Sequence, residues 1–382
     1  MAASEVFTEE QPMQLDDHEN PRCWSSVKKW TCTIILVLWT TIIAFTSSIY
    51  TAAIPSIAKE YGCSSIVATV GLTTFLLGFG TGPLIFAPLS EVWGRIMIFR
   101  FALGLFVLLQ IGCALAPNIA SMIIFRFLAG FLGSPAVTNS GGSITDMWAP
   151  DSRSVPLALF SATSFLGPVI APTVGGFICQ YITWRWTFWL VLIMSSVCYI
   201  PLIALVPETY APKLLTDKRR RITGSAAGDQ PPLRSLLRTT LTRPLNILLT
   251  EPILFLLSLY MAFVFGILYL DFTAYPIIYR DTRNWTPGIA GLSFLGICVG
   301  MTLATLVSPY INRIHKHYTL KLGGAYPETR LPHLIPISWL IPVSLFWFAW
   351  TSTPPTIYWL VGIAAGIPFD FALILLFLGI KG

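Results

Sequence analysis

Long uninterrupted runs of apolar residues, separated by short polar intervals, dominate the pattern along the chain. A helix needs about 20 mostly apolar residues to cross the hydrocarbon core of a bilayer, and ten runs meet this requirement. They cover residues 31–53, 66–90, 97–116, 120–142, 155–178, 187–206, 253–276, 288–310, 333–351 and 357–379. The apolar residues are continuous and do not alternate with polar ones, which favours helices over a β-barrel. We therefore expect an all-α integral membrane protein.

Composition excludes an ordinary soluble protein. Hydrophobic residues make up 54% of the chain and charged residues only 11%, whereas soluble domains carry about 25% charged residues. The mean hydropathy is +0.70. The formal net charge of +6 could suggest a nucleic-acid partner, but the basic residues lie in the gaps between apolar runs. We expect contact with membrane lipid and no nucleic acid.

The distribution of Lys and Arg predicts the orientation. With the N-terminus inside the cell, 19 of the 24 basic residues fall on the inner side, Arg100 near the inner end of its run among them, and 4 fall in outer loops, which leaves Arg126 deeper within a span. Cytoplasmic loops of membrane proteins carry an excess of Lys and Arg. The N-terminus is therefore expected to be cytoplasmic.

Polar segments divide the chain into four parts. Residues 1–30 form an expected disordered cytoplasmic tail, because they hold no early apolar core of the kind a signal peptide needs. Residues 31–206 contain six spans, residues 207–252 form a basic cytoplasmic linker, and residues 253–382 contain four spans. The acids of the tail are Glu5, Glu9, Glu10, Asp16, Asp17 and Glu19.

Metal-ligand patterns and catalytic constellations are missing from the sequence. The four His are His18, His315, His317 and His333, and none shares a span with other metal ligands. The seven Cys do not have metal-ligand spacing either. We therefore expect neither an enzyme nor a metal site.

Three stretches together resemble the major facilitator superfamily, specifically the fungal branch of twelve-span drug:proton antiporters. The first stretch is Ala87-Pro88-Leu89-Ser90-Glu91-Val92-Trp93-Gly94-Arg95, between the second and third spans. In the family this loop holds an acid and a basic residue that tie neighbouring helices together at the inner side. The resemblance implies this inner-gate role for Glu91, Gly94 and Arg95. This chain departs from the family pattern at Ala87, Glu91 and Ile96.

The second stretch surrounds Arg126 in the fourth span, followed by Gly130. In the family an Arg at this position is tied to proton movement. Independently of the family, an Arg inside a span is costly unless it faces a wet or paired interior, so it is a functional candidate. The alternative is that its side chain extends to the outer surface of the membrane.

The third stretch resembles the fifth-span signature of antiporters. Its small residues recur at four-residue spacing, which makes a flat stripe against which another helix can pack closely. Two prolines within it each remove a backbone donor and favour a bend. The stripe consists of Gly167, Pro168, Ala171, Pro172, Gly175 and Gly176.

The resemblance implies a fold and an activity. The fold is a helical bundle of two pseudo-symmetric halves, and because members have twelve spans, the C-terminal half is expected to be truncated. The activity is export of a small amphipathic molecule, such as a drug, toxin, fungal secondary metabolite or polyamine, by proton antiport with alternating access. The proton gradient would supply the energy, without a cofactor. Alternatives are a truncated remnant without transport activity and a proton-coupled uptake permease.

Two further expectations follow from the resemblance. A monomer is expected, and the plasma membrane is the expected location, with the vacuolar membrane as the alternative.

The tripeptide Asn284-Trp285-Thr286 matches a glycosylation acceptor, but the bulky Trp and the following Pro287 argue against its use.

Only two acids lie within the expected spans, Asp271 and Asp370. Burial in lipid favours the protonated form of a carboxyl group, so either could carry the proton. Relatives usually have a Glu at the position of Thr273, and a small residue at the position of Asp370. The seventh span also carries aromatic residues that could form an apolar wall for the substrate: Tyr260, Phe263, Tyr269 and Tyr275.

Overall fold

The computed structural model describes residues 15–16, 18–223, 242, 246–321, 331–352 and 356–381. The expected tail at residues 1–14 and the linker residues 224–241 and 243–245 lie outside this part of the chain. Within it, ten helical segments are long and apolar enough to cross a membrane. This confirms the all-α, multi-pass prediction.

The helices of the first half are α1 (Ser26–Tyr61), α2 (Ser65–Trp93), α3 (Arg95–Ala114), α4 (Ile119–Gly133), α5 (Pro135–Met147), α6 (Ser154–Tyr181) and α7 (Arg185–Leu205). Helix α8 (Ala211–Thr223) follows. The second half contains α10 (Pro252–Ile277), the π-helix η2 (Ile278–Thr282), α11 (Pro287–Gly291), the 3₁₀-helix η3 (Leu292–Phe294), α12 (Leu295–Lys321), α13 (Leu331–Ser338), α14 (Leu340–Ser352) and α15 (Trp359–Lys381). A short 3₁₀-helix, η1 (Pro21–Cys23), precedes α1.

Helix α1 extends beyond the apolar run that predicted it. It has 36 residues, begins after Ser25 and ends before Gly62. The Ser25 side chain accepts a hydrogen bond from the Lys28 amide, and Gly62 adopts a left-handed φ of 62°, which glycine does without steric cost. The apolar run marks the part of a helix that suits hydrocarbon, whereas the capping residues mark where the helix ends.

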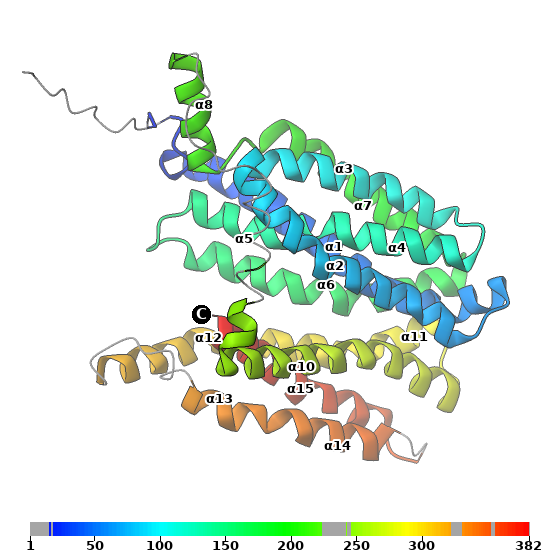
Figure 1. Ribbon diagram of the computed structural model, residues 1–382. Coiled ribbons are helices and arrows are strands. Elements are labelled where there is room, and N and C mark those ends of the chain that lie inside the picture. Colours follow the sequence, from blue (N-terminus) through cyan, green and yellow to red (C-terminus); the bar gives the residue numbers. More distant parts are fainter. Residues whose placement is uncertain are drawn as a thin grey trace, which may run out of the picture.

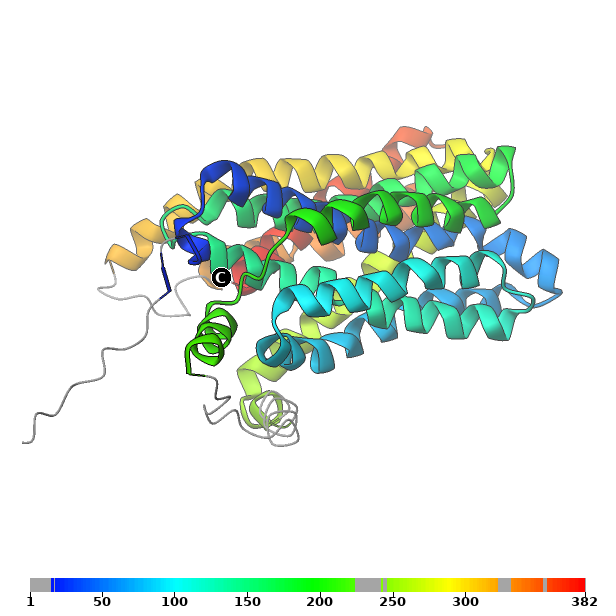
Figure 2. The same cartoon turned by 90° about the horizontal axis from the view of Figure 1, so that it is seen from above.

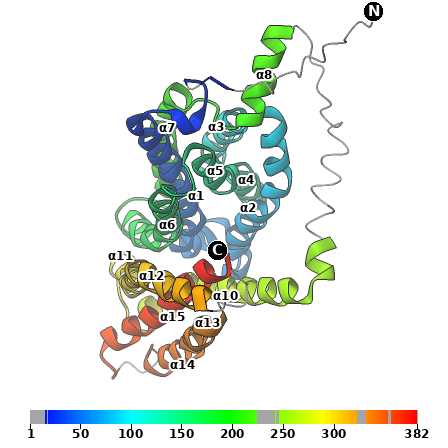
Figure 3. The same cartoon turned by 90° about the vertical axis from the view of Figure 1, so that its left-hand side faces the viewer.

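The two halves lie side by side. In Figure 1, α1 to α7 form the upper layer and α10 to α15 the lower one, and Figure 3 shows the same two groups viewed along the bundle. The helices run back and forth along one common axis, so the bundle has two ends. We call the end with α8 the α8 end and the opposite one the α11 end. The C-terminus lies at the α8 end (Figure 2).

Each half has its own core. In the first half α1 is central, and its Trp39 is fully buried and donates from Nε1 to the Cys198 carbonyl at 3.2 Å. In the second half the ring of Tyr275 stacks on Phe294 and on Phe348, with centroids 5.3 and 4.7 Å away. The two halves differ in burial: most of α1 is buried, whereas much of α10 is exposed.

Glycines set the distance between α2 and α4. A Cβ added at Gly78 would lie 2.2 Å from the Phe127 carbonyl oxygen, and one added at Gly130 would lie 2.0 Å from the Phe75 carbonyl oxygen. The backbones meet where a side chain would keep them apart, as in other small-residue interfaces between membrane helices. Gly130, part of the second family-like stretch, therefore has a packing role beside Arg126.

This packing leads to a stability prediction. Gly78→Ala is expected to destabilise the protein by about 1–3 kcal/mol, because the added methyl group collides with backbone. Gly80→Ala is the matched control, because nothing lies within 4 Å of a Cβ built there. The measurement is the thermal unfolding midpoint of the purified protein in detergent. Equal midpoints for the two variants would show that the α2–α4 approach is not closely constrained.

Candidate functional site

Arg126 lies wholly inside the first half. Its side chain is 0% exposed, and its guanidinium group donates to three backbone carbonyls. The acceptors are Gly71 on α2 at 3.1 Å, Thr46 on α1 at 3.1 Å and Ser47 on α1 at 3.3 Å. The side chain therefore does not extend to the membrane surface. It connects α4 to α1 and α2.

Two aromatic rings complete the surroundings of Arg126. Its Cζ atom lies 4.7 Å from the centroid of Tyr50 and 4.3 Å from that of Phe75. A ring face attracts a cation, most strongly where water is excluded. The positive charge is thus stabilised by carbonyl dipoles and ring faces, and no carboxylate pairs with it within the described part of the chain.

Ser47 connects this site to the second half. Its carbonyl accepts from Arg126, and its hydroxyl lies 3.0 Å from the phenol oxygen of Tyr269 on α10. One residue of α1 therefore contacts both the buried cation and a helix of the other half. Tyr269, which the sequence predicts to lie in a substrate wall, takes part in a polar contact between the halves.

The small-residue stripe of α6 packs on α1. A Cβ at Gly167 would lie 2.8 Å from the Thr41 carbonyl oxygen, and one at Gly175 would lie 2.9 Å from that of Ile49. Because residue 172 is a proline, the Pro168 carbonyl lacks its usual helical donor. The Ser48 hydroxyl of α1 supplies one at 2.6 Å.

The adjacent face of α6 packs on the second half near the α11 end. A Cβ at Gly176 would lie 2.4 Å from the Pro287 carbonyl oxygen, and one at Gly291 would lie 2.6 Å from the Cα of Thr173. The Thr173 hydroxyl donates to the Gly291 carbonyl at 2.6 Å. The stripe therefore serves two interfaces, one within the first half and one between the halves.

The two carboxyl candidates belong to the second half. Asp370 on α15 is 0% exposed, and Asp271 on α10 is half-buried. Their helices contact each other, so the structure places on neighbouring helices two residues that the sequence presented only as alternatives.

Three of the four aromatic residues expected to form a wall belong to the core of the second half. Tyr275 is buried in it, and Tyr260 and Tyr269 are partly buried against it. Phe263 is 67% exposed and lies on a different side of α10 from Tyr275. The sequence showed that these residues share a helix, but not which face each one occupies.

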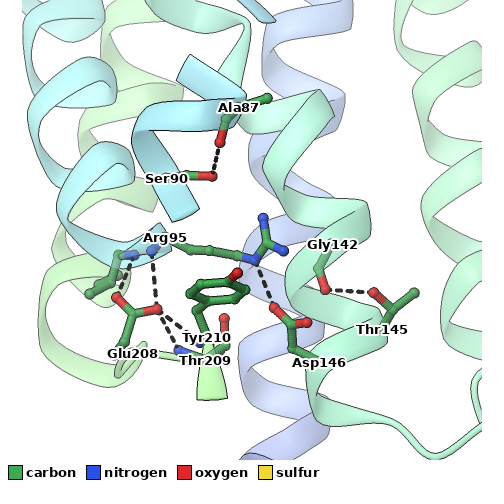
Figure 4. A network of polar contacts seen from close by, with 10 residues as sticks. Ala87, Ser90, Arg95, Gly142, Thr145, Asp146, Glu208, Thr209 and Tyr210 are labelled. Carbon is green, nitrogen blue, oxygen red and sulfur yellow. Dashed lines mark hydrogen bonds and ion pairs between the residues drawn. The ribbon is translucent and has the colours of Figure 1, made fainter. Parts of the chain in front are cut away.

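A charge network lies at the α8 end (Figure 4). Arg95 donates from Nε to Asp146 at 2.7 Å and lies 5.2 Å from the ring centroid of Tyr210. Burial raises the pKa of the Tyr210 phenol, so the ring beside Arg95 remains neutral near pH 7. The Glu91 carboxylate makes no hydrogen bond or ion pair in the part of the chain described. Asp146 is therefore the acid that partners Arg95, which the sequence did not indicate.

Glu208 caps the start of α3 in the same network. It accepts from the amides of Arg95 at 3.0 Å and Ile96 at 3.2 Å, and also from those of Thr209 and Tyr210. Gly94 has a φ of 95°, which permits the tight turn before α3. The carboxylate at a helix N-terminus also interacts favourably with the helix dipole. Glu208 thus ties the end of the first half to the loop between α2 and α3.

A second set of charges links the N-terminal segment to α8. Lys218 contacts Asp16 at 2.9 Å and Glu19 at 3.1 Å, and its hydrogen bond and charge lower the pKa of Asp16. Asp16, His18 and Glu19 come close enough together to hold a metal ion. The ammonium group of Lys218 is already in contact with both carboxylates.

A model described as Major Facilitator Superfamily matches residues 36–380. The chain belongs to the major facilitator superfamily. It is 42% identical over 388 aligned residues to the "Major facilitator superfamily multidrug transporter mdrA" of Aspergillus fumigatus. This alignment covers 98% of this chain and 64% of that protein. It is 36% identical to the "Efflux pump FUBT" of Fusarium oxysporum, over 96% of this chain and 63% of that protein. The chain thus spans just under two thirds of the length of these relatives.

Solved structures support the same fold. The partially occluded inward-open xylose transporter XylE of E. coli aligns with a TM-score of 0.65 at 16% identity, over 92% of this chain and 85% of that one. At this identity the likeness concerns the fold alone. The ten apolar helices and the family model together identify a multi-pass membrane protein.

The capping role of Glu208 leads to a prediction about local stability. Glu208→Ala is expected to raise amide exchange at the start of α3 about fivefold to thirtyfold, because losing an N-terminal cap costs about 1–2 kcal/mol. Hydrogen exchange with mass spectrometry of peptides spanning residues 93–98 measures this. Glu91→Ala is the control. Equal protection in both variants would contradict the capping role.

Proposed function

We propose that this chain belongs to a plasma-membrane exporter that moves a small amphipathic molecule outward in exchange for protons, with its N-terminus in the cytoplasm. The main support is the fully buried Arg126, whose charge has no carboxylate partner among the described residues. A cation is rarely kept in the interior of a membrane protein without a functional reason. The names of the relatives, a multidrug transporter and an efflux pump, favour export over uptake.

The proposed coupling runs through α1. Alternating access requires the two halves to rock about a site between them, so contacts between the halves must change. The Ser47–Tyr269 contact is one of these, and the same residue, Ser47, accepts a hydrogen bond from Arg126. A change in the charge near Arg126 would alter the position of α1 and therefore its contact with α10.

The two ends of the bundle have different proposed roles. Close packing of α6 against Pro287 and Gly291 keeps the halves together at the α11 end. At the α8 end, the Arg95–Asp146 pair and the Glu208 cap hold helices of the first half together. In our proposal the α11 end is the closed, outer side in this conformation, and the α8 end faces the cytoplasm.

The substrate and the proton site follow from the same arrangement. Apolar and aromatic side chains dominate the described spans, so the transported molecule is proposed to be amphipathic and bound with few hydrogen bonds. Asp271 and Asp370 are the proposed proton carriers, because they are the acids within the apolar runs of the second half, at residues 253–276 and 357–379. The proton gradient is the proposed energy source, and no cofactor is required.

The proposal predicts the behaviour of an Arg126 variant. Arg126→Ala is expected to abolish proton-driven accumulation of a fluorescent amphipathic dye in inside-out vesicles, because it removes the buried charge and leaves three carbonyls without a donor. Arg126→Lys is expected to rescue little, since an ammonium group cannot reproduce the forked geometry of a guanidinium group.

The control is Arg153→Ala, because Arg153 is exposed beside the start of α6. Membrane abundance is measured in parallel, so that a folding defect is recognised. Undiminished dye accumulation by Arg126→Ala would overturn the proposed coupling. Wild-type dye movement in the opposite direction would assign uptake, and no proton-driven movement by the wild-type chain would contradict the proposed function.

A further inference from the structure

Helices α10 and α15 bring two carboxyl groups to one level of the second half. The two helices contact each other and run in opposite directions. The Tyr275 phenol of α10 lies against Gly366 of α15, where an added Cβ would be 2.7 Å from the phenol oxygen. This contact fixes the register between the two helices.

Both acids lie one helical turn from that contact, on the side of the α8 end. Asp271 precedes Tyr275 by four residues on α10, and Asp370 follows Gly366 by four residues on α15. Residues four apart share a helix face, and the antiparallel directions therefore place both acids at the same level. At this level Asp370 is fully buried and Asp271 is half-buried.

Asp370 lacks a hydrogen-bond partner among the residues that the structure describes. It is 0% exposed, and neither carboxylate oxygen has a hydrogen-bond partner in the described part of the chain. Helices α12, α13, α14 and η3 also pack against α15, and the side chains described on them include no charged group. From α10 the titratable neighbours are Asp271 and Tyr275. A buried, unpaired carboxylate is strongly unfavourable.

We propose that Asp271 and Asp370 form a single proton-binding site, in which one proton is shared between the two carboxyl groups. Like charges at close range in a low dielectric disfavour double ionisation. Adding one proton removes one negative charge and converts one carboxylate into a donor for the other. That donor is what Asp370 lacks in the structure.

The chemistry of the site favours a proton over a metal ion. Calcium takes six to eight oxygen ligands, whereas two carboxylates and the Tyr275 phenol supply at most five oxygens. A proton needs only one donor and one acceptor, and O–H···O⁻ hydrogen bonds are among the short, strong ones.

The shared site deepens the proton antiport proposed above and rests on it for its role in transport. Tyr269, which contacts Ser47, lies two residues from Asp271, about 200° around α10. One helix therefore faces the Arg126 network on one side and the carboxyl pair on the other. Loading or releasing the shared proton would change the α10–α15 interface, and α10 would transmit this change towards α1.

The test is infrared spectroscopy of the purified full chain in lipid nanodiscs at neutral pH, without substrate or gradient. A shared proton gives a carboxylic C=O band shifted to low wavenumber by a charge-assisted hydrogen bond. Asp271→Asn and Asp370→Asn are each expected to move this band to higher wavenumber, because the remaining acid loses its carboxylate acceptor. Asp281→Asn is the matched control, an exposed acid just beyond α10, and should leave the band unchanged.

Each contrary outcome is informative. If Asp370→Asn removes the band while Asp271→Asn leaves it unchanged, Asp370 binds a proton alone and the shared site is wrong. An unchanged band in both variants also overturns it. Size-exclusion profiles identify a variant that fails to fold, and Asp271→Glu, which keeps the carboxylate, should then retain the shifted band. Because the spectra need no transport, a failure of the proposed export leaves this result intact, and the reverse also holds.

Discussion

The rest of the structure depends on how one positive charge is accommodated inside an apolar bundle. Arg126 is removed from water, so its guanidinium group must find acceptors in the protein. It finds them in carbonyls of Gly71, Thr46 and Ser47. These acceptors lie on α1 and α2, and Gly78 and Gly130 let α2 approach α4, which carries the guanidinium group, closely. The packing of small residues and the solvation of the charge are thus one constraint.

This constraint extends to the second half through α1. The helix packs on the small residues of α6, which on its adjacent face contacts Pro287 and Gly291. Through Ser47, α1 also contacts Tyr269 of α10. The second half therefore meets the first at a seam of close backbone contacts near the α11 end and at a polar contact beside Arg126. The carboxyl pair lies on the other side of α10.

The sequence predicted the features that depend on composition and local pattern. Ten apolar helices and the family could be inferred from run length and motif, and the cost of a charge in lipid made Arg126 a functional candidate. The sequence did not reveal which side of its helix a residue occupies, or which residues far apart in the chain contact each other. Asp146 as the partner of Arg95, Glu208 as the cap of α3, and the outward position of Phe263 depend on how helices pack against each other. Ser47 gave no sequence signal, because a serine in a membrane helix is common.

The most direct test of the account is a double-mutant cycle on proton-driven transport, with Ser47→Ala and Tyr269→Phe singly and together. Each change removes one hydroxyl of the contact between the halves and keeps the rest of the side chain. The account predicts that each single variant slows transport and that the double variant is no slower than the slower single one, because both changes break the same contact. Fully additive losses, or single variants that transport at the wild-type rate, would contradict coupling of Arg126 to α10 through Ser47.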